Sequence, residues 1–200
     1  MPTSQTPPSS IEVKELLAAE FDYIAGTANQ ANEDRARVSS FYLVAVGSLV
    51  AALFGTQVFD PNSLSNSLAV NLMFSILFFL LTFLGASTIL QLARLRSAWF
   101  DSVMAMNKIK DFVIAQHPAL SEAFPWRMST VPDKYKPNSV SYYQAVEVAV
   151  IDGLMFGAGV FFAQQAFLNI ATVNWVISIV SGCAMILVQL QIYKHALNIK

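Results

Sequence analysis

The sequence predicts an all-α integral membrane protein whose four transmembrane helices form two hairpins. Hydrophobic residues make up 55% of the 200 residues and charged residues 12%, whereas about a quarter of the residues in a soluble domain are charged. Three long stretches carry no charge: 38–59, 61–93 and 153–193. A membrane span needs roughly 20 apolar residues. The first two stretches therefore hold one span each, and the third holds most of two.

We place the spans at about 40–57, 68–91, 144–168 and 175–193, with ends uncertain by about 2 to 4 residues. All twelve Lys and Arg residues then precede the first span, separate the second from the third, or follow the fourth. The loops 58–67 and 169–174 contain none. Because basic loops stay cytoplasmic, we expect both termini and the central connection to be cytoplasmic, in a plasma membrane or bacterial inner membrane.

Residues 11–117 are expected to form a cytoplasmic stalk together with the first hairpin, after a disordered tail at 1–10. Residues 11–38 contain no proline and carry apolar side chains at alternating spacings of three and four, as one face of a helix requires. The same spacing returns over 92–117. Each segment is about 40 Å long as a helix. The first and second helices are therefore predicted to extend out of the membrane as an antiparallel, coiled-coil-like pair.

Charges along this stalk predict its register. If residue 40 of the first helix lies beside residue 91 of the second, acidic residues of the first helix come near basic residues of the second at two heights along the stalk. The charged candidates just outside the first hairpin are Glu33, Asp34, Arg35, Arg37, Arg94 and Arg96. The group before the first span is interpreted either as a regulatory contact or as an ordinary helical ion pair with arginines that reach lipid headgroups.

Residues 118–143 are predicted to be a proline-rich cytoplasmic connection that returns along the stalk. They contain four prolines and the aromatic residues Trp126, Tyr135, Tyr142 and Tyr143. Amphipathic aromatics collect at the membrane interface, whereas aromatics on a loop also serve as binding epitopes. The second interpretation makes this loop a docking site for a cytoplasmic protein partner.

Asp152 is the strongest candidate for a functional residue, since an acid inside the bilayer is costly and usually functional. Glu147, Gln164 and Gln165 are further polar residues in the predicted third span. Asp152 is predicted either to hold a proton or cation, or to lie at a helix N-terminus, where the macrodipole favours an acid. The sequence leaves both readings open.

Small residues at spacings of four mark helix-packing faces: Gly47, Ala51 and Gly55 in the first span, and Gly153 and Gly157 in the third. Such faces let helices approach closely, within one chain or between chains. We therefore expect the protein to form a homo-oligomer in the lipid bilayer.

Enzymatic function, cofactors, metal ions and nucleic acid are not expected. The chain has two histidines and one cysteine, a net charge of −1, and no phosphate-loop or hydrolase motif. A nucleic-acid partner normally requires a clustered basic surface.

We therefore predict a non-enzymatic, self-associating membrane protein with a helical sensing or docking stalk. The alternatives are a small ion channel or transporter using Asp152, and an accessory structural subunit of a membrane complex. The layout resembles that of small bacterial membrane effectors such as the SLATT class, in architecture alone. This resemblance implies that the membrane is permeabilised when a signal reorganises the stalk.

Overall fold

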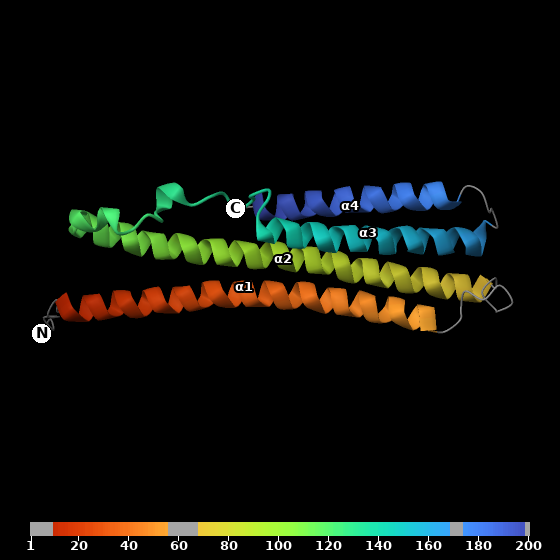
Figure 1. Cartoon of the computed structure of the whole chain (residues 1–200), viewed down its shortest axis with the longest axis horizontal. Helices are drawn as coiled ribbons and strands as arrows, with labels where there is room; N and C mark the ends of the chain where they lie inside the picture. Colours follow the sequence, from red (N-terminus) through yellow and green to blue (C-terminus); the bar gives the residue numbers. More distant parts are fainter. Residues whose placement is uncertain (1–9, 56–67, 169–173, 199–200) are drawn as a thin grey trace, which may run out of the picture.

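A computed structural model describes residues 10–55, 68–168 and 174–198, and every regular element in these ranges is helical (Figure 1). Four helices are long and apolar enough to cross a membrane. They are α1 (Ser10–Gly55), α2 (Leu68–Gln116), α3 (Val140–Phe167) and α4 (Asn174–Asn198). The predicted all-α class with four candidate spans is confirmed in this form. The predicted tail at 1–10, apart from Ser10, and most of both short loops lie outside the described residues.

The four helices lie side by side, with α2 packed against each of the other three (Figure 1). α1 and α2 have 46 and 49 residues, whereas α3 and α4 have 28 and 25. The longer helices therefore extend beyond the shorter ones, at the end where the N-terminus lies (Figure 1). The start of α1 and the end of α2 meet there around one groove. The molecule thus has a four-helix part and a two-helix part.

The ends of α2 and α3 follow from local chemistry. Proline restricts the residue before it and cannot continue a helix. α2 accordingly ends at Gln116, two residues before Pro118, which opens the short helix η2 (Pro118–Glu122). α3 begins at Val140 because the Ser139 side chain caps it, accepting a hydrogen bond of 3.2 Å from the Tyr142 backbone N–H. It therefore starts four residues before the predicted span.

The connection between α2 and α3, which includes η3 (Met128–Thr130), runs back along α2. Arg127 pairs with Asp111 at 3.8 Å, and Lys134 pairs with Asp101 at 3.2 Å. Each successive contact lies further back along α2, and the last one, between Arg96 Nε and the Lys134 carbonyl, is 3.1 Å long. The connection thus ends beside the start of the four-helix part.

The main hydrophobic core lies where the two-helix part joins the four-helix part. All four long helices contribute buried residues to it: Tyr42, Val46, Ile89, Leu92, Ala93, Ala145, Val148, Ala149, Tyr193 and Leu197. Further along, Phe74 and Phe78 of α2 contact Phe162 of α3 with ring centroids 5.1 and 5.7 Å apart. α2 is therefore the central helix, and its aromatic face is partly internal.

Glycines bring α3 and α4 into close contact. A Cβ atom on Gly153 would lie 2.8 Å from the Gly182 carbonyl oxygen, and one on Gly157 would lie 2.9 Å from the Ser178 carbonyl oxygen. Real Cβ atoms do not approach so closely. The predicted small face of the third span is thus used within the chain, against small residues of α4.

Candidate functional site

Asp152 of α3 is completely buried at a point where all four long helices meet. Tyr42 of α1 donates its hydroxyl hydrogen to Asp152 Oδ1 over 2.9 Å, and Gln189 of α4 donates from Nε2 to Oδ2. Gly85 of α2 lies against the carboxylate, because a Cβ atom there would overlap Asp152 Oδ1 and Cγ. These four residues are the Asp152 site. One side chain therefore joins four helices.

The position of Asp152 within α3 tests one of the two sequence readings, that of an acid at a helix N-terminus. Asp152 lies twelve residues after Val140, about 18 Å along the helix axis. The macrodipole acts within the first turn, so the reading of Asp152 as a helix N-terminal acid is wrong. Ala145, Val148, Ala149 and Asp152 are all buried, with the spacing of one helix face. α3 directs its acid to the core by the same periodicity that buries its apolar residues.

Gln189 can serve both protonation states of Asp152. Its Nε2 donates to the carboxylate, whereas its Oε1 is buried without a hydrogen-bond partner among the described residues. A protonated carboxyl group gains an O–H donor, which an amide rotated about its terminal bond accepts through Oε1. The site therefore has a hydrogen-bonding arrangement for the carboxylate and another for the carboxylic acid.

A second polar level lies one helical turn beyond Gln189. Tyr193 of α4 is buried, and its hydroxyl lies 2.9 Å from Ser141 Oγ and donates to the Ser141 carbonyl over 3.3 Å. Ser141 is in the first turn of α3. The level therefore ties the end of α4 to the start of α3, where the connection arrives.

Two buried arginines, Arg35 of α1 and Arg96 of α2, form a third level, which we call the arginine pair. Arg35 Nε donates to Gln144 Oε1 over 2.9 Å. The Arg96 guanidinium stacks on Trp99, 4.3 Å from the ring centroid, and its Nε donates to the Lys134 carbonyl. Burial lowers the pKa of both groups, and the charge of Arg35 lowers that of Arg96 further. Arginine side chains are not deprotonated in proteins, so both groups are cations.

The other acidic and amide candidates do not join the Asp152 site. Glu147 is exposed. Gln164 is buried toward the far end of α3, where its Nε2 donates to Ser178 Oγ over 3.2 Å, and Gln165 is half-buried. Of the predicted intramembrane group, Asp152 alone lies at the meeting point of four helices.

The charged residues predicted to make contacts between α1 and α2 are mostly exposed or bonded within their own helix. Glu33, Arg37 and Arg94 are exposed, and Asp34 pairs with Arg37 of its own helix at 3.2 Å. None of the three ion pairs within the described residues joins α1 to α2. Other contacts do cross: Thr27 and Ser102 hydroxyls lie 3.2 Å apart, and Lys110 lies over the Phe21 ring. The charge register itself stays a prediction.

The predicted small face of α1 is open. Gly47 and Ala51 are exposed, and a Cβ atom on Gly47 would meet nothing within 4 Å. The surroundings of Gly55 lie outside the described side chains.

Sequence reasoning missed the groups around the three buried polar levels: Tyr42, Gly85, Gln144, Ser141 and Tyr193. One signal pointed to Gly85, which is the only glycine between residues 68 and 91. Three further polar residues lie within apolar runs of the sequence: Tyr42, Gln189 and Tyr193. The sequence shows these residues but does not show which groups they bond to. Their partners lie on other helices.

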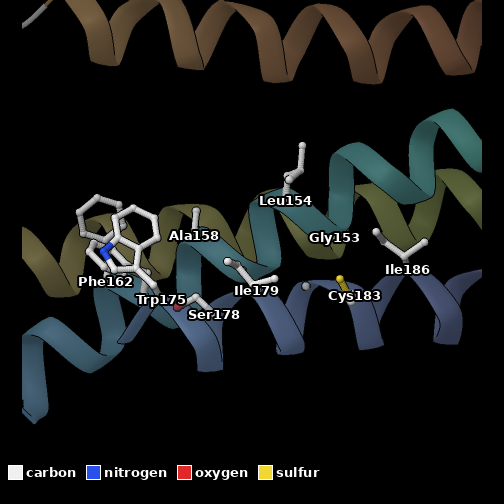
Figure 2. A pocket seen from close by; sticks show the side chains of 12 residues that line it. Gly153, Leu154, Ala158, Phe162, Trp175, Ser178, Ile179, Cys183 and Ile186 are labelled. Atoms are coloured by element: carbon white, nitrogen blue, oxygen red, sulfur yellow. The ribbon is translucent and has the colours of Figure 1, made fainter. Parts of the chain in front are cut away.

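An apolar groove lies between α3 and α4 and has a volume of about 400 Å³. Figure 2 shows Phe162 and Trp175 at one end and Ile186 near the other, with Leu154, Ala158 and Ile179 between them. Apart from Ser178 and the Cys183 thiol, its lining is apolar or glycine. The groove therefore has little with which to orient a polar ligand, and the chemistry of the molecule lies in the buried polar levels.

The described residues contain no group of three or more His, Cys, Asp or Glu side chains placed to hold a metal ion. Comparison of the chain with protein-family models, with curated proteins and with solved structures finds no match.

Proposed function

We propose that the protein is a non-enzymatic, multi-pass membrane protein that transmits a cytoplasmic docking event to its transmembrane helices. In this proposal α1 with α2 and α3 with α4 form two transmembrane hairpins, and the extended halves of α1 and α2 are an antiparallel cytoplasmic stalk. Both termini are cytoplasmic, in a plasma or bacterial inner membrane. The output is a change in membrane permeability by self-associated copies.

The distribution of charge and apolar surface supports the membrane placement. Residues 38–55 and 68–93, which include the halves of α1 and α2 nearer the four-helix part, carry no charged side chain. Large apolar side chains in the spans are exposed, including Val44, Leu80, Phe83, Leu154 and Ile179. Contiguous exposed apolar surface marks an interaction with membrane or protein. A hydrocarbon environment accounts for it on all four helices.

The Asp152 site carries the proposal of signal transmission. α1 and α2 are unbroken helices, so a displacement of the stalk is passed along them to Tyr42 and Gly85. These two residues contact Asp152 directly, and Gln189 holds it from α4. A buried hydrogen-bonded charge is costly to leave partly unpaired. A movement of the first two spans therefore either carries the other two spans with it or breaks the hydrogen bonds of the Asp152 site.

A groove at the far end of the stalk supports docking. It has a volume of about 800 Å³ and lies between the start of α1, the end of α2 and the connection. Leu17, Phe21, Val113 and Phe124 supply apolar surface, and Lys14, Asp22, Lys110 and His117 are also part of its lining. An apolar groove with a few polar groups is the usual form of a binding site. A ligand or peptide there would set the separation of the two stalk helices.

The open small face of α1 supports self-association. Gly47 and Ala51 are exposed although their spacing is that of a helix-packing face. Such faces bring transmembrane helices of separate chains into contact.

A stalk crosslink tests the proposal. Thr27→Cys and Ser102→Cys are introduced into a Cys183→Ala background, at positions whose hydroxyl oxygens lie 3.2 Å apart and so suit a disulfide. The protein is reconstituted in vesicles, and potassium efflux is measured in the reduced and the oxidised state. We expect the efflux of the two states to differ several-fold, with each single-cysteine variant insensitive to oxidation.

Two results would contradict the proposal. Equal efflux before and after a crosslink that is complete by gel analysis argues against transmission from the stalk. Vesicles that stay sealed when the protein is shown to be inserted and oligomeric argue against a permeability function.

A proton or cation pathway through Asp152 is the second candidate. The observation favouring it is the Gln189 amide, which can satisfy either protonation state. Reconstituted Asp152→Asn protein should then lose proton or cation flux while remaining folded. Unchanged flux in that variant rejects this candidate.

A further inference from the structure

The arginine pair is a concentration of buried positive charge that has no ion pair with an acid in the part of the chain that the structure describes. Arg35 is 9% exposed and Arg96 7%. Neither takes part in an ion pair within 4 Å among the described residues. A buried charge is normally paired, because removing it from water is costly. Here two charges of the same sign share one region.

Four acids of the described region near the arginine pair either bond to other groups or are exposed. Asp34 pairs with the exposed Arg37, and Asp101 pairs with Lys134. Asp152 is held by Tyr42 and Gln189, and Glu147 is exposed. The hydrogen bonds of the arginine pair go instead to neutral oxygens, those of the Gln144 side chain and the Lys134 backbone.

A chain of contacts places both arginines around the start of α3. Arg96 donates a hydrogen bond to the Lys134 carbonyl. Tyr135, which follows Lys134 in the sequence, packs against Tyr142 with ring centroids 6.1 Å apart. Tyr142 is two residues before Gln144, which holds Arg35. Both arginines also act electrostatically on Tyr193, whose hydroxyl bonds to Ser141.

The arginine pair has guanidinium donors beyond the two Nε groups that already bond to the protein. Arg35 Nη1 is buried and has no hydrogen-bond partner among the described residues. The Arg96 guanidinium is fixed by its Nε bond and by the Trp99 ring, and its two Nη groups are further donors. The nearby hydroxyls of Ser141 and Tyr193 bond to each other and are not counted among these donors. Planar arginine donors match phosphate oxygens in geometry and charge.

We propose that the arginine pair binds one phosphate group per chain. The phosphate belongs either to the headgroup of an anionic phospholipid or to a soluble phosphate compound. The lipid source rests on the proposed function, which puts residues 40, 91, 144 and 193 at the cytoplasmic membrane surface. The phosphate chemistry rests on the arginines themselves. Bound there, the anion joins α1, α2 and the start of α3 where the stalk meets the spans.

Ligand-dependent thermal stability of the full chain tests the proposal. The protein is purified in an uncharged detergent and phosphate-free buffer, and its melting temperature is measured with phosphatidylglycerol, with phosphatidylcholine, or with pyrophosphate. We expect phosphatidylglycerol or pyrophosphate to raise the melting temperature, and native mass spectrometry to show one bound molecule per chain. Stabilisation by phosphatidylglycerol alone identifies the lipid as the source, and stabilisation by pyrophosphate identifies a soluble phosphate.

Exposed arginines on the same helices provide matched controls. Arg35→Gln and Arg96→Gln should weaken binding of the stabilising probe by about tenfold or more, the effect of losing a charge-assisted hydrogen bond. Arg37→Gln and Arg94→Gln remove the same charge from exposed positions and should leave binding unchanged. Arg35→Lys keeps the charge without the planar fork and is expected to bind more weakly than wild type. It also serves as the test variant if Arg35→Gln does not fold.

The proposal is overturned if neither probe stabilises the wild-type protein. It is also overturned if the exposed-arginine variants lose as much binding as the buried ones, since the effect is then general surface charge. The readout does not involve permeability. A protein that binds phosphate at the pair but leaves vesicles sealed therefore contradicts the proposed function and not this site.

Discussion

The Asp152 site and the arginine pair are two buried charged regions, and their α1 residues, Tyr42 and Arg35, are seven positions apart in the sequence. Asp152 receives hydrogen bonds from two other helices and lies against a glycine of a third. The arginine pair bonds only to neutral oxygens among the described residues, and Arg35 Nη1 has no partner. The contrast indicates different roles: the first region holds the bundle together from within, and the second depends on an anion from outside.

The largest effect is expected at Gly85, where any side chain must displace the Asp152 carboxylate. Gly85→Leu should lower the free energy of unfolding by about 3 kcal/mol or more, because it breaks a buried charged network as well as overpacking the core. Denaturant unfolding in detergent micelles measures this. Gly47→Leu places the same side chain on α1, where a Cβ atom meets nothing within 4 Å, and should change stability little. Equal losses in both variants would show that Gly85 has no special relation to Asp152.

Removing the acid itself tests whether the Asp152 site stabilises the bundle. Asp152→Ala leaves the Tyr42 and Gln189 donors buried without their acceptor and should cost about 2 to 4 kcal/mol. The same unfolding measurement on Glu147→Ala is the control, because that acid is exposed on the same helix. A cost for Glu147→Ala as large as that for Asp152→Ala would mean that burial at the four-helix meeting point is unimportant.

Tyr42→Phe removes a single donor and keeps the ring. The lost hydrogen bond to a charged acceptor should reduce stability by about 1.5 to 3 kcal/mol. Tyr23→Phe makes the same change at an exposed position of α1 and should be neutral. If the two variants unfold at the same denaturant concentration, the Tyr42–Asp152 bond contributes nothing measurable.

Substitution in the arginine pair should change the stability of the protein much less than substitution in the Asp152 site. In phosphate-free detergent, Arg35→Gln should alter the free energy of unfolding by no more than about 1 kcal/mol in either direction, because the charge it removes has no acid partner in the described ranges. Arg37→Gln is the exposed control. A loss as large as that of Asp152→Ala would show that Arg35 is satisfied inside the protein, and the contrast between the two regions would disappear.

The smallest effect is expected where the connection contacts α2. Asp101→Asn breaks the pair with Lys134, in which the Asp101 side chain is 66% exposed, and solvent-exposed pairs are worth at most about 1 kcal/mol. Thermal melting should therefore shift only slightly, as for Asp133→Asn on the exposed part of the connection. A clearly larger shift would show that this pair positions Lys134, and through its carbonyl Arg96.

The sequence predicted the helices well and the site only in part. The uncharged runs gave four candidate spans, and Pro118 predicted the end of α2. Asp152 stood out because it is an acid next to a long apolar run. Its neighbour Glu147 looked similar in the sequence but is exposed, because five residues along a helix turn a side chain to the opposite face.

Charge spacing was the weakest guide. It identified Arg96 as a candidate through expected pairing with acids across α1 and α2, and Arg35 as part of the charged group before the first span. Both are instead buried and bond to neutral oxygens. Helices of matching length permit many registers, and exposed charges contribute too little to choose among them.

The sequence by itself determined where the helices are, how long they are and how apolar their surfaces are, because these depend on residues within a few turns of one another. The tertiary structure alone decided that Tyr42, Gly85 and Gln189 surround Asp152. It also decided that two arginines are buried without an ion pair to any acid among the described residues. Those neighbours depend on the rotation and axial position of each helix against the others, which side-chain packing sets across the whole bundle.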